Sequence, residues 1–216
     1  MWRQDDDTQS MLRESASGFL SSRHSLARFR ACRTSDTGYD PAFRIEMGDL
    51  GWTGILLPET MEGAALGLLP AATIAELCGE HLVPEPFVAS SVIAATILAA
   101  SGSATAEDLG RQIASGVAAA LLADQEEAGV VSPKPPVTSL ASRGGRLILS
   151  GSKVFVPCWS KEATLLVTAT FGGEPCIVAL APSNIGTTFV TRRMTDGSVA
   201  ADISFDGVVV DEESIL

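Results

Sequence analysis

The stretch Leu50-Gly51-Trp52-Thr53-Gly54-Ile55-Leu56-Leu57-Pro58-Glu59 joins two segments with helical patterning. The segment before it begins at Asp40-Pro41, where Asp is a favourable N-cap and Pro suits the first helical position. Its apolar side chains recur at helical spacing, and Gly51 closes it. The segment after it begins at Pro70 and ends before Pro84. The stretch therefore lies between two helices, and we expect Trp52 to pack inside a helical domain.

The rest of the first half also predicts helices, and the second half predicts strands. Helical spacing covers 9–23 and 104–114, and 87–100 is apolar nearly all round, which is typical of a buried central helix. After Gly116 come short apolar runs separated by glycine turns. Asp196-Gly197 is a type I′ hairpin signal. The expected strands are 117–123, 137–141, 146–149, 153–156, 163–170, 176–181, 187–192 and 199–205.

This segregation of helices and strands predicts an α+β chain of two domains. We expect an all-α domain over residues 1–116 and an antiparallel β-barrel over residues 117–216.

Composition excludes several classes of partner. The chain has 216 residues, with 15 Lys and Arg against 26 Asp and Glu, and a net charge of −11. A negative charge of that size disfavours nucleic acid and anionic membranes as partners. No secretory signal is recognisable, and the four cysteines are scattered with no CxxC pair. We expect a cytoplasmic protein with free thiols and no metal site.

Motifs for nucleophilic, metal or phosphate chemistry are absent from the sequence. Neither His24 nor His81 has a partner at a spacing that suggests a triad. The carboxylates of Glu126 and Glu127 fall in a loop, where exposure to solvent is the ordinary expectation. The sequence predicts no catalytic residue by motif alone.

Four stretches of the sequence nevertheless carry a recognisable pattern: 50–59, 75–86, 149–156 and 203–210. In their order and spacing they resemble the acyl-CoA dehydrogenase family. The stretch 50–59 is similar to its LGWxG…PE segment, and 75–86 is similar to its helix and P-x-P turn. The stretch 149–156 is similar to a strand with a G-x-K core, and 203–210 is similar to the strand that closes its middle domain.

The resemblance implies an N-terminal helical domain, a middle β-barrel and a C-terminal four-helix domain, with FAD between the last two. It implies an acyl-CoA substrate that loses its α-proton to a carboxylate while a hydride passes to the flavin. In most of the family that base is a Glu of the C-terminal domain. We expect the chain to stop before that domain, so that it contains no catalytic base.

The flavin segments of the family can be compared residue by residue. Its T-E-P-x-x-G-S segment corresponds to 124–130, where only Gly129 matches, while Asp124 replaces a hydroxyl. Its second segment, an aromatic, an aliphatic and a hydroxyl residue, corresponds to Phe155, Val156 and Pro157. The resemblance therefore implies cofactor contacts at Gly129, Phe155 and Val156. The alternative is a plain turn glycine and ordinary barrel residues.

Two functions follow from these matches. The chain is either the front part of an FAD-dependent acyl-CoA dehydrogenase or a non-catalytic partner subunit of a heteromeric one, whose flavin site has degenerated. In both cases we expect no dehydrogenase activity from the isolated chain, and a homo- or hetero-oligomer. We also expect an exposed apolar face where the C-terminal domain would pack.

Overall fold

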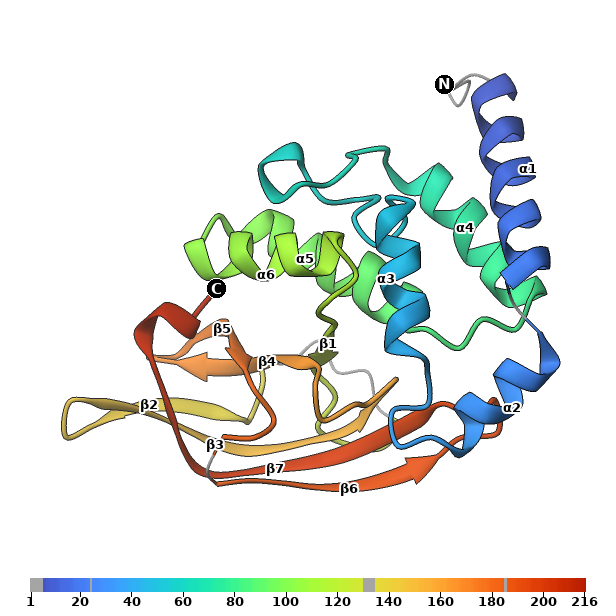
Figure 1. The fold of residues 1–216 in the computed structure, drawn as a ribbon. Coiled ribbons are helices and arrows are strands. Elements are labelled where there is room, and N and C mark those ends of the chain that lie inside the picture. The colour runs from blue at the N-terminus through green and yellow to red at the C-terminus, as the bar shows by residue number, and fades with distance from the viewer. Residues whose placement is uncertain (1–5, 24, 130–134, 185) are drawn as a thin grey trace.

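The helices and the strands of the protein form two layers, which are seen in a computed structural model in Figure 1. The structure describes residues 6–23, 25–129, 135–184 and 186–216. The helices occupy the upper part of the view and one sheet occupies the lower part, with α2 (Leu26–Thr34) lying near one end of that sheet. The predicted α+β class, with helices followed by strands, is confirmed.

The helical layer contains the predicted helices, and the helix expected over 87–100 is divided into a π-helix and an α-helix. The sequence pattern missed one α-helix, α2, and one 3-10 helix, η1. Helix α2 is mostly exposed, with Arg28 and Phe29 partly buried and Cys32 as its only fully buried residue, and therefore shows little apolar periodicity. Ser25, Asp40 and Ser103 cap α2, α3 and α6 through their side-chain oxygens. The helices of this layer are α1 (Asp6–Arg23), α2 (Leu26–Thr34), α3 (Pro41–Asp49), η1 (Glu59–Met61), α4 (Leu68–Glu80), η2 (Phe87–Ala94, a π-helix), α5 (Ala95–Ser101) and α6 (Ala104–Ala114), and a short 3-10 helix, η3 (Glu212–Ser214), follows the last strand.

The stretch 50–59 turns the chain through the helical core. Trp52 is 5% exposed, and the Phe19 ring meets it edge-on at 5.5 Å between ring centroids, so its predicted packing is confirmed. Gly54 and Ile55 accept backbone hydrogen bonds from residues 64 and 66, which fold the following loop back onto the stretch.

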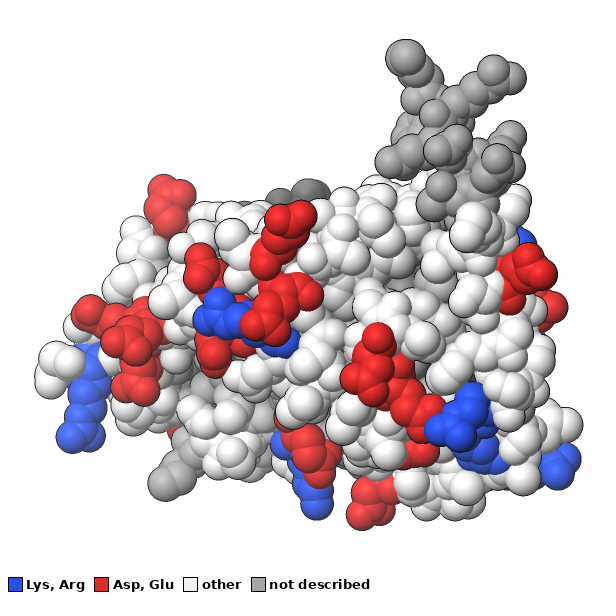
Figure 2. Space-filling view, turned by 45° about the horizontal axis from the view of Figure 1, so that its top comes forward, with Lys and Arg blue, Asp and Glu red and all other residues white. Residues whose placement is uncertain are grey.

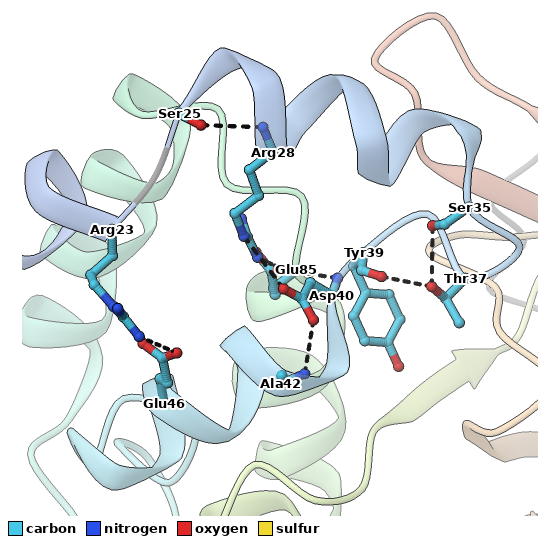
Figure 3. Close-up of polar contacts among 10 residues, drawn as sticks. All are labelled: Arg23, Ser25, Arg28, Ser35, Thr37, Tyr39, Asp40, Ala42, Glu46 and Glu85. Atoms are coloured by element: carbon cyan, nitrogen blue, oxygen red, sulfur yellow. Dashed lines mark hydrogen bonds and ion pairs between the residues drawn. The ribbon is translucent and has the colours of Figure 1, made fainter.

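A buried charge network fixes α2, α3 and the turn before η2 to one another (Figure 3). The Arg28 guanidinium donates to Glu85 and lies 3.7 Å from the Phe43 ring centroid. Glu85 also accepts the backbone N–H of Asp40, the cap of α3, at 3.1 Å. Burial raises the pKa of Glu85, and Arg28 opposes that shift. The Arg23–Glu46 ion pair, at 2.5 Å, adds an exposed contact between α1 and α3.

The strands form one mixed sheet of seven strands rather than the predicted antiparallel barrel. Two expected strands merge into β3, and β7 continues five residues beyond its predicted end. The order is β1-β4-β2-β3-β7-β6, and β5 pairs with β4. The strands are β1 (Ala120–Ala123), β2 (Ser139–Arg143), β3 (Arg146–Val156), β4 (Thr164–Phe171), β5 (Glu174–Leu180), β6 (Thr187–Arg193) and β7 (Val199–Val210).

The barrel prediction is wrong because β4 pairs in parallel with both β1 and β2, and the sheet does not close. Strands β2 and β3 lie between β1 and β4 in the sequence, so the pairing of β1 with β4 joins residues that are distant along the chain. In the described part of the chain, β6 pairs with β7 alone and forms an open edge. Both faces of β6 are solvated, since six of its seven residues are exposed and the other is half-buried.

Glycine pairs make two of the hairpins. Gly144-Gly145 joins β2 to β3 and Gly172-Gly173 joins β4 to β5, and all four have positive φ, as two-residue type I′ turns require. The β6–β7 hairpin predicted at Asp196-Gly197 also forms. Its loop has five residues, however, because the register pairs Arg193 with Val199.

The helical layer and the sheet share apolar and polar contacts. One core cluster joins helix residues such as Leu98 and Ile113 to Ala120 of β1 and Leu166 of β4. Arg44, buried in α3, donates to the Gly116 carbonyl at 2.6 Å and to Ser90 at 3.2 Å. Burial lowers the pKa of Arg44 to about 10. Apolar contacts and hydrogen bonds therefore connect the helices with the sheet across the domain boundary that we expect near residue 116.

The surface reflects the acidic composition. On the face in Figure 2, acidic side chains cover more of the surface than basic ones. No helix in the described residues has the length and apolar character needed to cross a membrane.

Candidate functional site

A cavity of about 1150 Å³ lies on the sheet, where the loop after β1 meets the C-terminal end of β3. Its volume suits a ligand of cofactor size. Both segments that resemble the flavin segments of the family line it, the first through Asp124 to Glu127 and the second through Phe155 and Pro157. The remaining lining residues come from the approach to β2, from β3 and β4, and from β5: Pro135, Pro136, Val137, Thr138, Gly151, Ser152, Thr168, Pro175, Cys176 and Ile177.

A buried lysine organises the loop at this cavity. Lys153 of β3 has no solvent-exposed surface, and its ammonium donates to Glu126 at 2.8 Å and to the Thr168 hydroxyl at 2.9 Å. Its third hydrogen bond goes to the Asp124 carbonyl at 3.3 Å. All three donors of the ammonium are satisfied, as a buried charge requires. Lys153 therefore fixes the loop to two strands.

Glu126 is the acceptor at the centre of this arrangement. Its two carboxylate oxygens also accept the backbone N–H groups of Val137 and Thr138, each at 2.7 Å. Burial raises the pKa of Glu126, but the hydrogen bonds from Lys153, Thr138 and Val137 lower it to about 2. Burial lowers the pKa of Lys153, and Glu126 opposes that shift. We regard the pair as ionised at neutral pH because each charge has its hydrogen-bonding partners in place.

The three predicted cofactor contacts lie in different environments. Phe155 lines the cavity with 47% of its surface exposed. Val156 is 1% exposed, its side chain belongs to the core of the sheet, and it does not line the cavity. Gly129 has a φ of +74° in an exposed turn, with open space where a Cβ would lie. Cofactor binding by these residues stays a prediction, and the structure brings only Phe155 to the cavity.

Sequence reasoning missed both partners of the Lys153–Glu126 pair as site residues. Glu126 was expected to be exposed, which is wrong, since 22% of its side chain is accessible and the remainder contacts its donors. Glu127 is exposed as expected. One signal was available: in β3, Lys153 occupies the same alternating position as the buried Leu147 and Leu149. A charged residue on an inward face requires a buried partner.

The described residues contain no group of three or more His, Cys, Asp or Glu side chains that could hold a metal ion. The four cysteines are free thiols. Burial raises the pKa of Cys78 to about 12 and that of Cys158 to about 11, so neither is a thiolate at neutral pH. Cys176 is the cysteine that lines the cavity, and burial raises the pKa of its thiol as well, which disfavours the nucleophilic thiolate there.

Comparison with known proteins places this architecture among acyl-CoA dehydrogenases. A family model described as the acyl-CoA dehydrogenase N-terminal domain matches residues 6–117. Acyl-CoA dehydrogenase IpdE2 of Mycobacterium tuberculosis is 30% identical over 96 residues, which are 44% of this chain and 30% of that protein.

Two solved structures extend the likeness over nearly the whole chain. A variant of the steroid ACAD Tcur3481-Tcur3483 is 28% identical with a TM-score of 0.83, over 94% of this chain and 56% of that one. The ChsE4-ChsE5 complex from Mycobacterium tuberculosis is 20% identical with a TM-score of 0.84, over 98% of this chain and 57% of that one, and shows the fold alone. The match thus spans less than two thirds of each of these proteins.

Proposed function

Because this chain belongs to the acyl-CoA dehydrogenase family, we propose that it forms one wall of a site where an acyl-CoA thioester is dehydrogenated between its α and β carbons. The observation that supports this proposal is the meeting of the two family-like flavin segments at one cavity. The segments are separated along the chain by β2 and most of β3, so their convergence is a property of the fold.

FAD, the cofactor that the family implies, fits this cavity only in part. The volume is sufficient, and the Phe155 ring is an aromatic surface on which a planar ring could pack. The polar groups do not fit, since Asp124 and Glu127 present carboxylates and Pro157 has no N–H to donate. Lys153 is already bound to Glu126. The described residues that line the cavity include no lysine or arginine, so they offer no positive charge to an anionic dinucleotide.

We propose accordingly that this chain contributes shape and an aromatic wall, and that protein outside these 216 residues contributes the rest. That protein would supply the donors to the flavin and the carboxylate that removes the α-proton. A cavity made of parts from two pieces of protein excludes water only when both are present, and such exclusion strengthens the electrostatic interactions inside it.

A second candidate function is a non-catalytic partner subunit of a heteromeric acyl-CoA dehydrogenase. Two observations favour it. Asp124 stands where the family has a hydroxyl, and Pro157 stands where it has a hydroxyl and an N–H donor. The chain is also 28% identical to a steroid ACAD named for two components, Tcur3481-Tcur3483. In this role, the chain would shape or support an acyl-CoA site whose flavin is held by its partner.

Flavin content distinguishes the two candidates. We expect the purified 216-residue chain to show no acyl-CoA-dependent reduction of an artificial electron acceptor, and measurable turnover would contradict the proposal. The complete reading frame should then be purified alone and with any co-expressed partner. Yellow protein from the complete chain alone supports the first candidate, and colour only with a partner supports the second. No flavin under either condition would refute both.

A further inference from the structure

The alternation of buried and exposed side chains along β3 breaks at the C-terminal end of the strand, next to the cavity. Leu147, Leu149 and Lys153 are buried, so a regular strand would place Phe155 on the same inward face. Instead Val156 is buried and Phe155 is exposed in the cavity wall. The inward position has moved by one residue.

A β-bulge causes this change. Lys153 pairs with Ile203 of β7, and Val156 pairs with Ala201, so three steps along β3 match two along β7. Asp202 is therefore the single β7 residue opposite Val154 and Phe155. One extra residue in a strand turns every following side chain to the other face.

The bulge holds Phe155 in a backbone conformation that a bulky residue rarely adopts. Its φ is +54°, in the left-handed region where Cβ crowds the backbone. Such a conformation persists where surrounding contacts impose it, and these residues cluster at functional sites. The contacts here are specific, because the Val154 N–H donates to the Gln125 carbonyl at 2.7 Å and the Phe155 N–H donates to Asp202 Oδ1 at 3.0 Å.

Asp202 is itself held in place by β6. Its Oδ2 lies 2.5 Å from the Arg192 guanidinium. Arg192 is diagonal to Asp202 across the β6–β7 pair, since Val190 is the direct register partner of Asp202. Arg192 and the Phe155 N–H both lower the pKa of Asp202, so its carboxylate is charged at neutral pH.

We propose that Asp202 is a positioning residue for the cavity: by accepting the Phe155 N–H at the bulge, it keeps the aromatic ring out of the sheet core and in the cavity wall. Arg192 supports it by orienting the carboxylate. Only the identity of the ligand, a planar aromatic ring system that packs on Phe155, rests on the proposed function. The link from Asp202 to the position of the ring is independent of that function.

Amide hydrogen exchange of the full 216-residue chain tests this link directly. In Asp202→Ala, the Phe155 amide should exchange at least about tenfold faster, because a hydrogen bond to a charged acceptor is lost. Asp202→Asn keeps an acceptor oxygen and should retain most of the protection. Asp206→Ala removes an exposed carboxylate from the same strand and serves as the control. Equal protection of the Phe155 amide in Asp202→Ala and Asp206→Ala would overturn the proposal.

The position of the ring needs its own measurement. In a Phe155→Trp background, acrylamide quenching and the emission maximum report how exposed the new indole is, once the emission of the matching protein that keeps Phe155 is subtracted to remove the three native tryptophans. Adding Asp202→Ala should shift emission to shorter wavelength and reduce quenching, and Asp202→Asn should restore both. If Asp202→Ala changes neither observable, the ring does not depend on Asp202 and the proposal is wrong.

Ligand binding is measured separately, with free FAD as the probe on the complete reading frame and its partner. Failure of FAD to bind the wild-type assembly would refute the proposed function, while exchange and fluorescence still decide the role of Asp202. If FAD binds, weaker binding to Asp202→Ala than to Asp202→Asn supports the proposal. Equal binding to the two variants would overturn the contribution of Asp202 to the ligand site.

Discussion

Replacing Lys153 with Met should destabilise the protein strongly although it keeps the length and much of the volume of the side chain. The wild-type ammonium is fully buried and makes three hydrogen bonds, one of them the 2.8 Å ion pair with Glu126. Breaking a buried pair by removing one partner costs about 3 to 5 kcal/mol, because the other charge is left without its counter-ion.

Two features of the site reduce that figure. Glu126 is 22% accessible and keeps its two backbone donors, so water can replace part of the lost interaction. Removing the ammonium also recovers its desolvation penalty. We therefore expect a loss of about 2 to 3 kcal/mol in the free energy of unfolding. For a chain of this length, that corresponds to a decrease in Tm of about 4 to 12 °C.

Thermal unfolding followed by circular dichroism, together with urea unfolding followed by tryptophan fluorescence, measures this loss. Lys161→Met is the matched control, since the Lys161 side chain is 69% exposed and lies 3.9 Å from Glu162. It should change stability by no more than about 0.5 kcal/mol. The double variant of Lys153→Met with Glu126→Gln should be less destabilised than the two single variants added together. If Lys153→Met is as stable as the Lys161→Met control, our account of the buried pair is wrong.

Three further outcomes are expected. The folded pKa of Glu126, about 2, lies below its unfolded value of about 4.3, so its stabilisation is present above pH 4.3 and is lost as pH falls toward 2; acid titrations of Glu126→Gln should lack that part of the slope, worth at most about 3 kcal/mol. Gly48→Ala should destabilise by about 1 to 3 kcal/mol because its Cβ would lie 2.4 Å from the Ser115 carbonyl oxygen, whereas Gly79→Ala, in α4 with open space around it, should stabilise by up to about 1 kcal/mol in the same urea titration. Exposed apolar side chains such as Leu68, 69% accessible, lead us to expect association at high concentration; sedimentation of a strictly monomeric chain would contradict it.

The sequence by itself determined the local features of this protein. Asp40-Pro41 marked the start of α3, and the change to glycine-punctuated strands after Gly116 separated the helical and β regions. These predictions succeeded because caps, helical periodicity and turn glycines act between residues a few positions apart. The family resemblance of 50–59 and of the later stretches was likewise visible in the sequence alone.

Only the tertiary structure decided how the strands pair and which side chains meet at the cavity. The parallel contact of β4 with β1 joins residues more than forty positions apart, and an antiparallel barrel has the same alternating pattern. The Lys153–Glu126 pair and the bulge opposite Asp202 likewise depend on register between segments that are distant in sequence. A one-residue shift in register reverses the face of a side chain without changing any local pattern. For that reason the sequence predicts Phe155 and Val156 alike as cofactor contacts, whereas the fold exposes Phe155 to the cavity and buries Val156.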